Sequence, residues 1–283
     1  MAENSIRIVS YNVENLFHTP DSARHWTRTK YWNKIEKISR VIANIQSPAI
    51  VGLQEIDNDS CLMDLCHKMR NFHYGYVHYD SPDHRGIDVG LLYDTTRFQV
   101  LYSEALRVPL DSVTTTRDIL YVCGTIINPP LSNDTLHLMV CHLPSMLGGR
   151  AESQWKRDSA LMVIQRQLAK LGYYSDVHKK VKIIIMGDFN DDKTDIKGME
   201  NAIQRTRHVK THKYQGRWAQ LDYFWISEAL KEKASAHVFD ADWLMEDDAK
   251  YLDKRPKRTY NGWRDNKEGY SDHLPIYLDL TCD

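Results

Sequence analysis

The stretch KIIIMGDFN, Lys182–Asn190, is an apolar run that ends in an aspartate and an asparagine. An apolar run of this length before a glycine is typical of a buried strand, which we expect over Val181–Gly187. Because side chains alternate along a strand, Asp188 and Asn190 share one side and Phe189 takes the other. The acid and the amide can then face one reacting atom, the acid taking a proton or binding a metal. An Asx turn after the strand explains the same residues equally well.

Similar apolar runs recur along the chain and predict further buried strands. They are Ile6–Asn12, Ala49–Glu55, Asp88–Asp94, Leu120–Asn128, Thr135–His142, Leu221–Ser227 and Leu274–Leu280. Helical spacing separates some of them: Tyr31, Ile35, Ile38, Ile42 and Ile45 form one apolar stripe, and two more helices are expected near residues 151–171 and 61–70. This alternation indicates an α/β protein. Strands in close succession around Asp88–His142 and after Leu221 indicate mixed or antiparallel sheets.

Composition restricts the class of protein. The chain has 283 residues without an internal repeat or a linker, so we expect one domain over residues 1–283. Its 37 basic and 38 acidic side chains give a formal charge of -1, which excludes a long-range basic field as the main attraction for a partner. Local arginines, lysines or a metal must therefore hold any anionic substrate. The sequence does not indicate an oligomeric state.

Cysteine usage and hydropathy bear on location. The five cysteines are odd in number and lack CxxC spacing, so they predict free thiols in a reducing compartment, without a zinc site or a disulfide framework. No stretch is apolar enough to span a membrane. The first residues, MAENSIRI, lack the pattern of a signal peptide. We therefore expect a cytoplasmic protein.

Polar residues stand at the ends of several expected strands. They are Asn12, Glu55, His142, the pair Asp188 and Asn190, and the segment Ser271–His273 that precedes the last strand. One such residue is ordinary, whereas five groups at strand ends predict that these ends meet at one cleft.

His273 and Asp222 are candidates for acid–base chemistry. A histidine needs a carboxylate to hold its tautomer, and the adjacent Asp272 cannot easily do so. Asp222 lies in the aromatic strand LDYFWIS, where a buried acid requires a partner. The alternative is that Asp222 lies on the exposed face of an edge strand.

Oxygen ligands suggest a hard metal ion. Asn12, Glu55 and Asp272 together form an all-oxygen set that suits Mg²⁺ or Mn²⁺ and not Zn²⁺. Taken alone, Glu55 is better explained as a solvated loop acid, and His142 as an ordinary histidine at a strand end. Arg150 and Arg157 lie seven residues apart on one helical face, where we expect them to face water.

Seven segments, in this order, resemble the endonuclease/exonuclease/phosphatase superfamily. They are SYNVENLF (Ser10–Phe17), LQEI (Leu53–Ile56), RGIDVGLLY (Arg85–Tyr93), CHLPS (Cys141–Ser145), GDFND (Gly187–Asp191), LDYFWIS (Leu221–Ser227) and YSDHLPI (Tyr270–Ile276). Each is weak alone, but together they span nearly the whole chain. The resemblance implies a four-layer α-β-β-α sandwich of two mixed β-sheets flanked by helices, and a divalent-metal-dependent phosphoric ester hydrolase.

The resemblance also implies roles for the site residues. Glu55 would be the principal metal ligand, with Asn12 and Asp272 in or near the metal shell and Glu14 joining through water. Asp188 would deprotonate the attacking water, and Asn190 would hold that water or a phosphate oxygen. His273 would contact the phosphate, with its tautomer fixed by Asp222. His142 would be a phosphate ligand or the acid for the leaving group, partnered by Asp88. Arg117 would lie near the phosphate.

The substrate is less defined. The basic run Lys254–Arg258, interleaved with Tyr251, Tyr260, Trp263 and Tyr270, could grip single-stranded nucleic acid, but a charged loop with inward-packed aromatics explains it better. A phosphodiesterase or nuclease is therefore the first interpretation. The second is a phosphatase or phospholipase-like enzyme acting on a small phosphorylated molecule or a lipid headgroup. The third is a binding module that keeps the fold, which the complete set of site residues disfavours.

Overall fold

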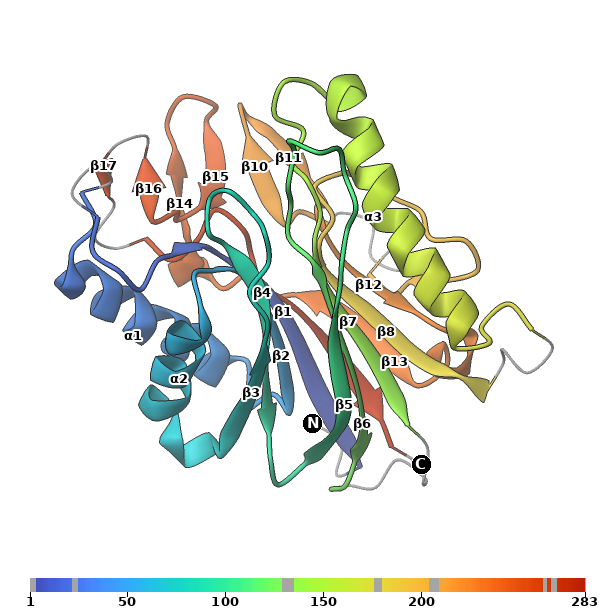
Figure 1. Ribbon diagram of the computed structural model, residues 1–283. Coiled ribbons are helices and arrows are strands. Elements are labelled where there is room, and N and C mark those ends of the chain that lie inside the picture. Colours follow the sequence, from blue (N-terminus) through green and yellow to red (C-terminus); the bar gives the residue numbers. More distant parts are fainter. Residues whose placement is uncertain are drawn as a thin grey trace.

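Two six-stranded sheets lie face to face at the centre of the molecule (Figure 1). The computed structural model describes residues 4–21, 25–128, 135–175, 180–203, 209–261, 264–265 and 269–282. The first sheet has the order β13 (Ala234–Val238), β18 (Ile276–Thr281), β1 (Ser5–Leu16), β2 (Ile50–Ile56), β4 (Asp88–Asp94) and β3 (Tyr74–His78). The second has the order β5 (Phe98–Leu106), β6 (Ile119–Ile126), β7 (Leu136–His142), β8 (Lys182–Asp188), β12 (Asp222–Ile226) and β9 (Glu200–Asn201).

Both sheets are mixed, as the close succession of strands predicts. One pair in each sheet is parallel, β1 with β2 and β7 with β8, and every other pair is antiparallel. The parallel pairs bring the carboxyl ends of β1 and β2, and of β7 and β8, to a common edge. The polar residues at the strand ends therefore gather there.

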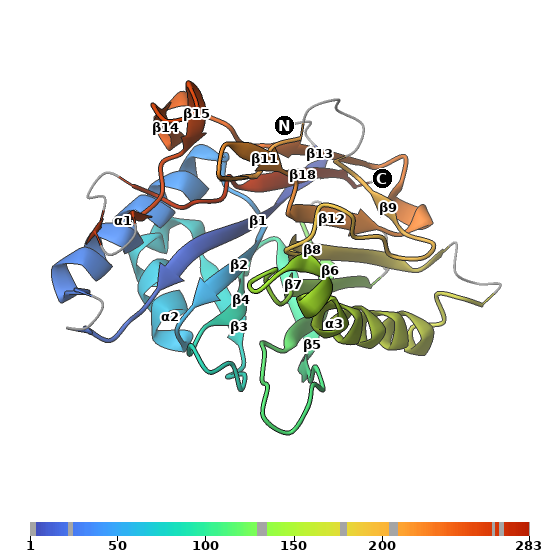
Figure 2. The ribbon, with the colours of Figure 1, turned by 90° about the horizontal axis from the view of Figure 1, so that it is seen from above.

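Helices cover the two outer faces. The helices α1 (Arg28–Asn44) and α2 (Asp59–Lys68) pack on the first sheet, and α3 (Arg150–Lys170) packs on the second (Figures 1 and 2). One apolar core fills the space between the sheets, and one lies under each helical layer. This confirms the four-layer α-β-β-α sandwich. None of the described helices is long and apolar enough to cross a membrane.

The buried faces of the elements follow from the sequence pattern. The stripe of α1 is buried, and Thr27 caps this helix by accepting a hydrogen bond from the backbone nitrogen of Lys30. Asn58 caps α2 in the same manner through Ser60. In β2, Gly52 faces the other sheet, where a Cβ would lie 3.0 Å from Cε of Met186. The glycine thus allows the two sheets to approach closely.

Several elements were not expected. Strands β3, β5, β9 and β13 carry mixed polar and apolar residues that hide their periodicity. Three hairpins are formed by β10 (His212–Tyr214) with β11 (Arg217–Ala219), β14 (Met245–Asp248) with β15 (Asp253–Pro256), and β16 (Tyr260–Asn261) with β17 (Arg264–Asp265). Short 3-10 turns lie at Arg70–Phe72, Glu228–Leu230 and Asp242–Leu244. The charged region after Asp240 therefore contains paired strands. Trp263 lies outside the described residues.

Candidate active site

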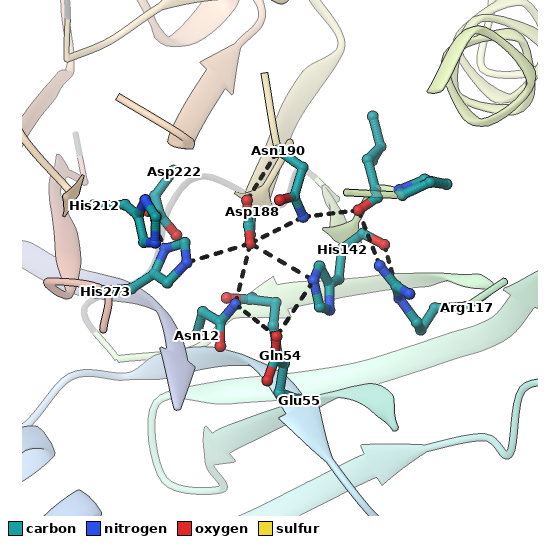
Figure 3. A network of polar contacts seen from close by, with 12 residues as sticks. Asn12, Gln54, Glu55, Arg117, His142, Asp188, Asn190, His212, Asp222 and His273 are labelled. Atoms are coloured by element: carbon teal, nitrogen blue, oxygen red, sulfur yellow. Dashed lines mark hydrogen bonds and ion pairs between the residues drawn. The ribbon is translucent and has the colours of Figure 1, made fainter. Parts of the chain in front are cut away.

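Strand ends from both sheets contribute to one polar cluster (Figure 3). The first sheet supplies Asn12 from β1, Glu55 from β2 and His273, which precedes β18. The second supplies His142 from β7, Asp188 from β8 and Asp222 from β12. The sequence prediction that these ends meet at one place is confirmed.

Asp188 lies at the centre of the cluster and is 1% exposed. Its carboxylate accepts hydrogen bonds from Nδ2 of Asn12 at 3.1 Å, and from the backbone nitrogen and Nδ2 of Asn190 at 2.8 and 3.2 Å. The bond from the Asn190 backbone is that of an Asx turn, so the two interpretations of GDFN are compatible. Phe189 points away into the core beneath α3, as the alternation predicts.

Two histidines flank Asp188. The Nε2 atoms of His142 and of His273 each lie 3.6 Å from Oδ2 of Asp188. His142 Nε2 is also 3.7 Å from Oε1 of Glu55. Nδ1 of His273 lies 2.8 Å from Oδ2 of Asp222, which is 1% exposed. The alternative of an exposed Asp222 is therefore wrong, and a buried carboxylate orients His273.

The surroundings shift the pKa values of the two histidines in opposite directions. Burial alone would lower the pKa of His273, but the carboxylates of Asp222 and Asp188 outweigh it and hold this pKa well above its ordinary value. Burial, together with the charges of Arg117 and Arg85, holds the pKa of His142 well below its ordinary value. At neutral pH, His273 is therefore an imidazolium and His142 a neutral imidazole.

Asp188 has an unusual pKa for an aspartate. Burial raises this pKa to about 7, and although the charge of His273 opposes the rise, the charge of Asp222 adds to it. A carboxyl group with a pKa near neutrality exchanges protons readily at physiological pH. Perturbed groups of this kind are common at catalytic sites.

A second group of carboxylates adjoins the histidines. Glu14 accepts a hydrogen bond from the backbone nitrogen of Thr259 at 2.6 Å, and Nη2 of Arg258 lies 3.0 Å from Glu14 and 3.1 Å from Asp272. Glu55 accepts a hydrogen bond from the backbone nitrogen of Asn15 at 2.9 Å. The pKa of Glu14 is raised to about 7, mainly by burial and also by repulsion from the charge of Asp272.

The chemistry of this donor set fits a divalent cation. Five carboxylates converge, on Glu14, Glu55, Asp188, Asp222 and Asp272. Three positive groups oppose them, on Lys34, Arg258 and His273, which leaves two negative charges in excess when all five acids are ionised. Oxygen donors of this kind suit Mg²⁺ or Mn²⁺. Ligand atoms of Asp188, Asp222 and His273 also lie within 4.8 Å of one another, but the 2.8 Å contact of Asp222 with His273 favours a hydrogen-bonded pair there.

Comparison with known proteins identifies the family. The model of the endonuclease/exonuclease/phosphatase family matches residues 7–282. The chain belongs to this family. Its members are metal-dependent phosphoric ester hydrolases, and this chain is an enzyme of that class. Compared by sequence with proteins of curated function, the chain has no significant match.

Solved structures of the family show the same fold. A humanized TDP2 of D. rerio is 19% identical, with a TM-score of 0.65, and the alignment covers 98% of this chain and 99% of that one. A family protein of Bacteroides thetaiotaomicron is 16% identical, with a TM-score of 0.67 and coverage of 99% and 98%. The human nocturnin catalytic domain, solved with a bound sulfate anion, is 16% identical, with a TM-score of 0.63 and coverage of 99% and 94%.

Asp88, expected beside His142 in the active site, makes other contacts. The carboxylate of Asp88 lies 3.2 Å from Nε2 of His78 and accepts a hydrogen bond from the backbone of Ser81. Nδ1 of His142 has no hydrogen-bond partner among the described residues, so the predicted pairing of Asp88 with His142 is wrong. The sequence could not reveal this because the pairing depends on how β3 and β4 align.

Arg117 is buried, and its guanidinium faces protein groups. It donates to Asp83 at 2.8 Å and to the backbone oxygens of His142 and Leu143 at 3.2 and 2.9 Å. Its hydrogen bonds therefore fix the end of β7 and the position of His142. These contacts place Arg117 beside His142, whereas its expected contact with the phosphate stays a prediction, because these donors are engaged by protein groups.

Arg157 does not face water as expected. Its side chain is 1% exposed, and its Nε lies 3.3 Å from the carboxylate of Asp191, next to the GDFN turn. Arg150 donates to the same carboxylate at 2.8 Å. The two arginines thus join the first turns of α3 to the segment that carries Asp188 and Asn190.

Sequence reasoning missed two site residues. The ring of His212 lies 4.6 Å from that of His273, centroid to centroid, because β10 forms a bridge to residue 273. Lys34 is buried, and its Nζ donates to the backbone oxygens of Glu14 at 2.8 Å and Tyr270 at 3.0 Å. Lys34 lies three residues after Tyr31 on the buried face of α1, and that spacing was the available signal.

Proposed function

We propose that residues 1–283 act as one catalytic domain, a phosphodiesterase that depends on a divalent metal. The arrangement around Asp188 carries the proposal: a buried carboxyl group stands between a charged and a neutral histidine, each 3.6 Å away. A phosphodiester is anionic and repels an attacking hydroxide. Catalysis therefore needs a base, fixed hydrogen-bond donors and positive charge at one point, and the cluster supplies all three.

Asp188 acts as the base in this proposal. Asn12 and Asn190 hold its carboxylate, so an oxygen is aimed at the attacking water. Both amide hydrogens of Asn190 are engaged, one by Asp188 and the other by the backbone oxygen of Leu143 at 2.9 Å. Its Oδ1 remains to accept a hydrogen bond from the water. Asn190 therefore orients the water and does not donate to the phosphate.

The histidines hold the phosphate in this proposal. His273 is an imidazolium whose Nδ1 is held by Asp222, so its Nε2 donates to a phosphate oxygen and stabilises the growing negative charge. His142 is neutral, so its Nε2–H can also donate, but it is a poor acid for the leaving group. Its role is therefore that of a phosphate ligand on the opposite side. Arg117 positions His142 through the backbone.

Glu55 would be the principal ligand of the metal, with Asn12 and Asp272 beside it and Glu14 joining through water. When bound, Mg²⁺, or Mn²⁺ in its place, offsets the phosphate charge and polarises the phosphorus–oxygen bonds. Arg258 bridges Glu14 and Asp272 and so keeps these carboxylates together. The five cysteines, all among the described residues, form no disulfide, which supports the proposal of a reducing, cytoplasmic location.

Product release from four substrates tests the proposal. They are bis-p-nitrophenyl phosphate, p-nitrophenyl phosphate, and single- and double-stranded DNA, each with Mg²⁺, Mn²⁺ or EDTA. We expect metal-dependent diester cleavage that falls by at least about 10²–10³ in Asp188→Ala and in His273→Ala. Asp192→Ala, an exposed acid four residues away, is the matched control and should retain activity.

Two results would contradict parts of the proposal. Unchanged turnover in both active-site variants would remove the assigned roles. Cleavage of the monoester alone would replace the phosphodiesterase by a phosphatase acting on a small phosphorylated molecule or a lipid headgroup.

A further inference from the structure

A second group of possible metal ligands lies where β3 leads into β4. His78 ends β3, Asp88 begins β4, and Asp80 follows β3 by two residues. One ligand atom from each lies within 4.8 Å of the others. Among the described residues, these three side chains make no hydrogen bond or ion pair with His142, Asp188 or Glu55. The group is therefore separate from the carboxylates of the active site.

Strand register explains why the three side chains meet. In the antiparallel ladder of β3 and β4, Tyr74 pairs with Asp94 and His78 with Gly90. Continuing this register by two residues places Asp80 opposite Asp88. Because strand side chains alternate, His78 and Asp80 share one face, and Asp88 meets them from the neighbouring strand.

The two buried ligands form a hydrogen bond whose length also matches the separation of a coordinated pair. Nε2 of His78 and Oδ2 of Asp88 are 3.2 Å apart. Two donors on one ion, each at about 2.1 Å, are separated by roughly 3.0 Å at a right angle and roughly 3.4 Å at a tetrahedral angle. The observed separation lies between these limits. Both side chains are buried, at 5% and 6% exposure, which fixes their positions, while Asp80 is exposed and can adjust.

Charge also favours a cation at this point. Asp88 uses Oδ1 to accept hydrogen bonds from the backbone and the hydroxyl of Ser81, which leaves Oδ2 directed at His78. Two carboxylates directly opposite on neighbouring strands repel one another. Among the described residues, no lysine or arginine pairs with Asp80 or Asp88. A bound cation would offset the repulsion.

We propose that His78, Asp80 and Asp88 form a second metal site, which takes a divalent transition ion such as Zn²⁺, Mn²⁺ or Co²⁺. An imidazole with two carboxylates suits these ions, whereas Mg²⁺ prefers oxygen ligands and retains its waters. With three protein ligands, the fourth position is open to water.

The site would support the catalytic cluster indirectly. The ligands bracket residues 79–87, which include Asp83. Asp83 accepts a hydrogen bond from Arg117, and Arg117 donates to the backbone oxygen of His142. An ion that joins Asp80 to Asp88 would fix both ends of this segment and so stabilise the support of His142. It touches no substrate in this role.

Cobalt binding in a protein without Glu55 tests the proposal. The Glu55→Gln chain is titrated with Co²⁺, followed by visible absorption and by paramagnetic shifts of histidine ring protons. We expect one saturable site with a strongly shifted imidazole, and we expect that resonance to disappear in Glu55→Gln with His78→Asn. Adding Asp80→Asn should weaken binding by more than about tenfold, since even outer-shell changes commonly cost about 10–100-fold.

The controls separate lost binding from misfolding. Asp80 is exposed, so Asp80→Asn should retain the thermal midpoint of its parent in EDTA. Asp240→Asn, an exposed acid on another loop, should bind Co²⁺ like the parent. The proposal is overturned if the Glu55→Gln chain shows no saturable site, or if His78→Asn and Asp80→Asn bind Co²⁺ with the affinity and the shifted resonances of the parent. No turnover is measured, so neither result requires that the protein be a phosphodiesterase; the role of Glu55 in metal binding enters only through the choice of background.

Discussion

Asp188→Asn should abolish the metal-dependent activity, and the stability of the metal-free variant relative to wild type should rise with pH. The substitution keeps the shape of the side chain, and its oxygen can still accept the two bonds that Asn12 Nδ2 and Asn190 Nδ2 make to Oδ2, while the bond from the Asn190 backbone to Oδ1 is lost. It removes a negative charge from a position that is 1% exposed. Burying an ionised carboxylate is costly even with partners nearby, so the neutral amide should fit the folded state better.

The shift in the pKa of Asp188 gives the magnitude. The pKa is raised from 3.8 to about 7, so the folded state binds more protons than the unfolded state between these values. The contribution of Asp188 to stability is then greatest below pH 4 and falls as the pH rises toward 7. At about 1.4 kcal/mol per pKa unit, the wild type loses up to about 4 kcal/mol in all, of which about 3 kcal/mol is lost between pH 5 and pH 8.

Urea unfolding in EDTA at pH 5 and pH 8 measures this effect. The difference in unfolding free energy, Asp188→Asn minus wild type, should increase by about 3 kcal/mol from the lower to the higher pH. Asp192→Asn, at an exposed position nearby, should show no such change. A difference that is constant with pH would refute the reasoning, because it would mean that Asp188 titrates alike in both states.

Two further outcomes test the surroundings of the site. Asp222→Asn removes the carboxylate 2.8 Å from His273, so the pKa of His273 should fall. The alkaline limb of the pH–rate profile should then move to lower pH. An unchanged limb and an unchanged titration of the His273 ring protons would contradict this. Arg157→Met leaves the buried carboxylate of Asp191 with one arginine fewer, so the free energy of unfolding in urea should fall by about 3 kcal/mol. Arg166→Met, at an exposed position of the same helix, should lower it by under about 0.5 kcal/mol. Equal losses in these two variants would argue against a structural role for Arg157.

Apolar runs located most of the central strands because those strands are buried on both faces. The strands expected to end at Asn12, Glu55, His142 and Gly187 end within four residues of the observed strand ends. Strand β5 was missed because only its end residues, Phe98 and Leu106, are buried, and the residues between them are half-buried or exposed without a clear apolar side. Local sequence thus predicts a strand well only where both faces are covered.

The polar strand ends were identified from sequence, but their partners were not. Asp222 and His273 are 51 residues apart and were correctly paired because a buried acid in an aromatic strand needs a cation. Asp88 was assigned to His142, whereas strand register brings it to His78. Arg157 was assigned to solvent, since helical spacing reveals a face but not what covers it. Strand register and the packing over a helix face depend on tertiary structure, so they cannot be inferred from a single sequence.

The catalytic cluster is divided between two sheets whose described strands share no backbone hydrogen bonds. Asn12, Glu55 and His273 move with one sheet, and His142, Asp188 and Asp222 move with the other. The apolar layer between them, with close approaches such as Gly52 against Met186, sets the spacing of the two halves together with side-chain contacts such as that of Asn12 with Asp188. A state in which the sheets remain paired internally but slide apart by an ångström would retain its circular dichroism and lose its turnover. Enzyme activity in this protein therefore reports on the distance between the sheets. It should respond to swelling of the interior before any measure of secondary structure does.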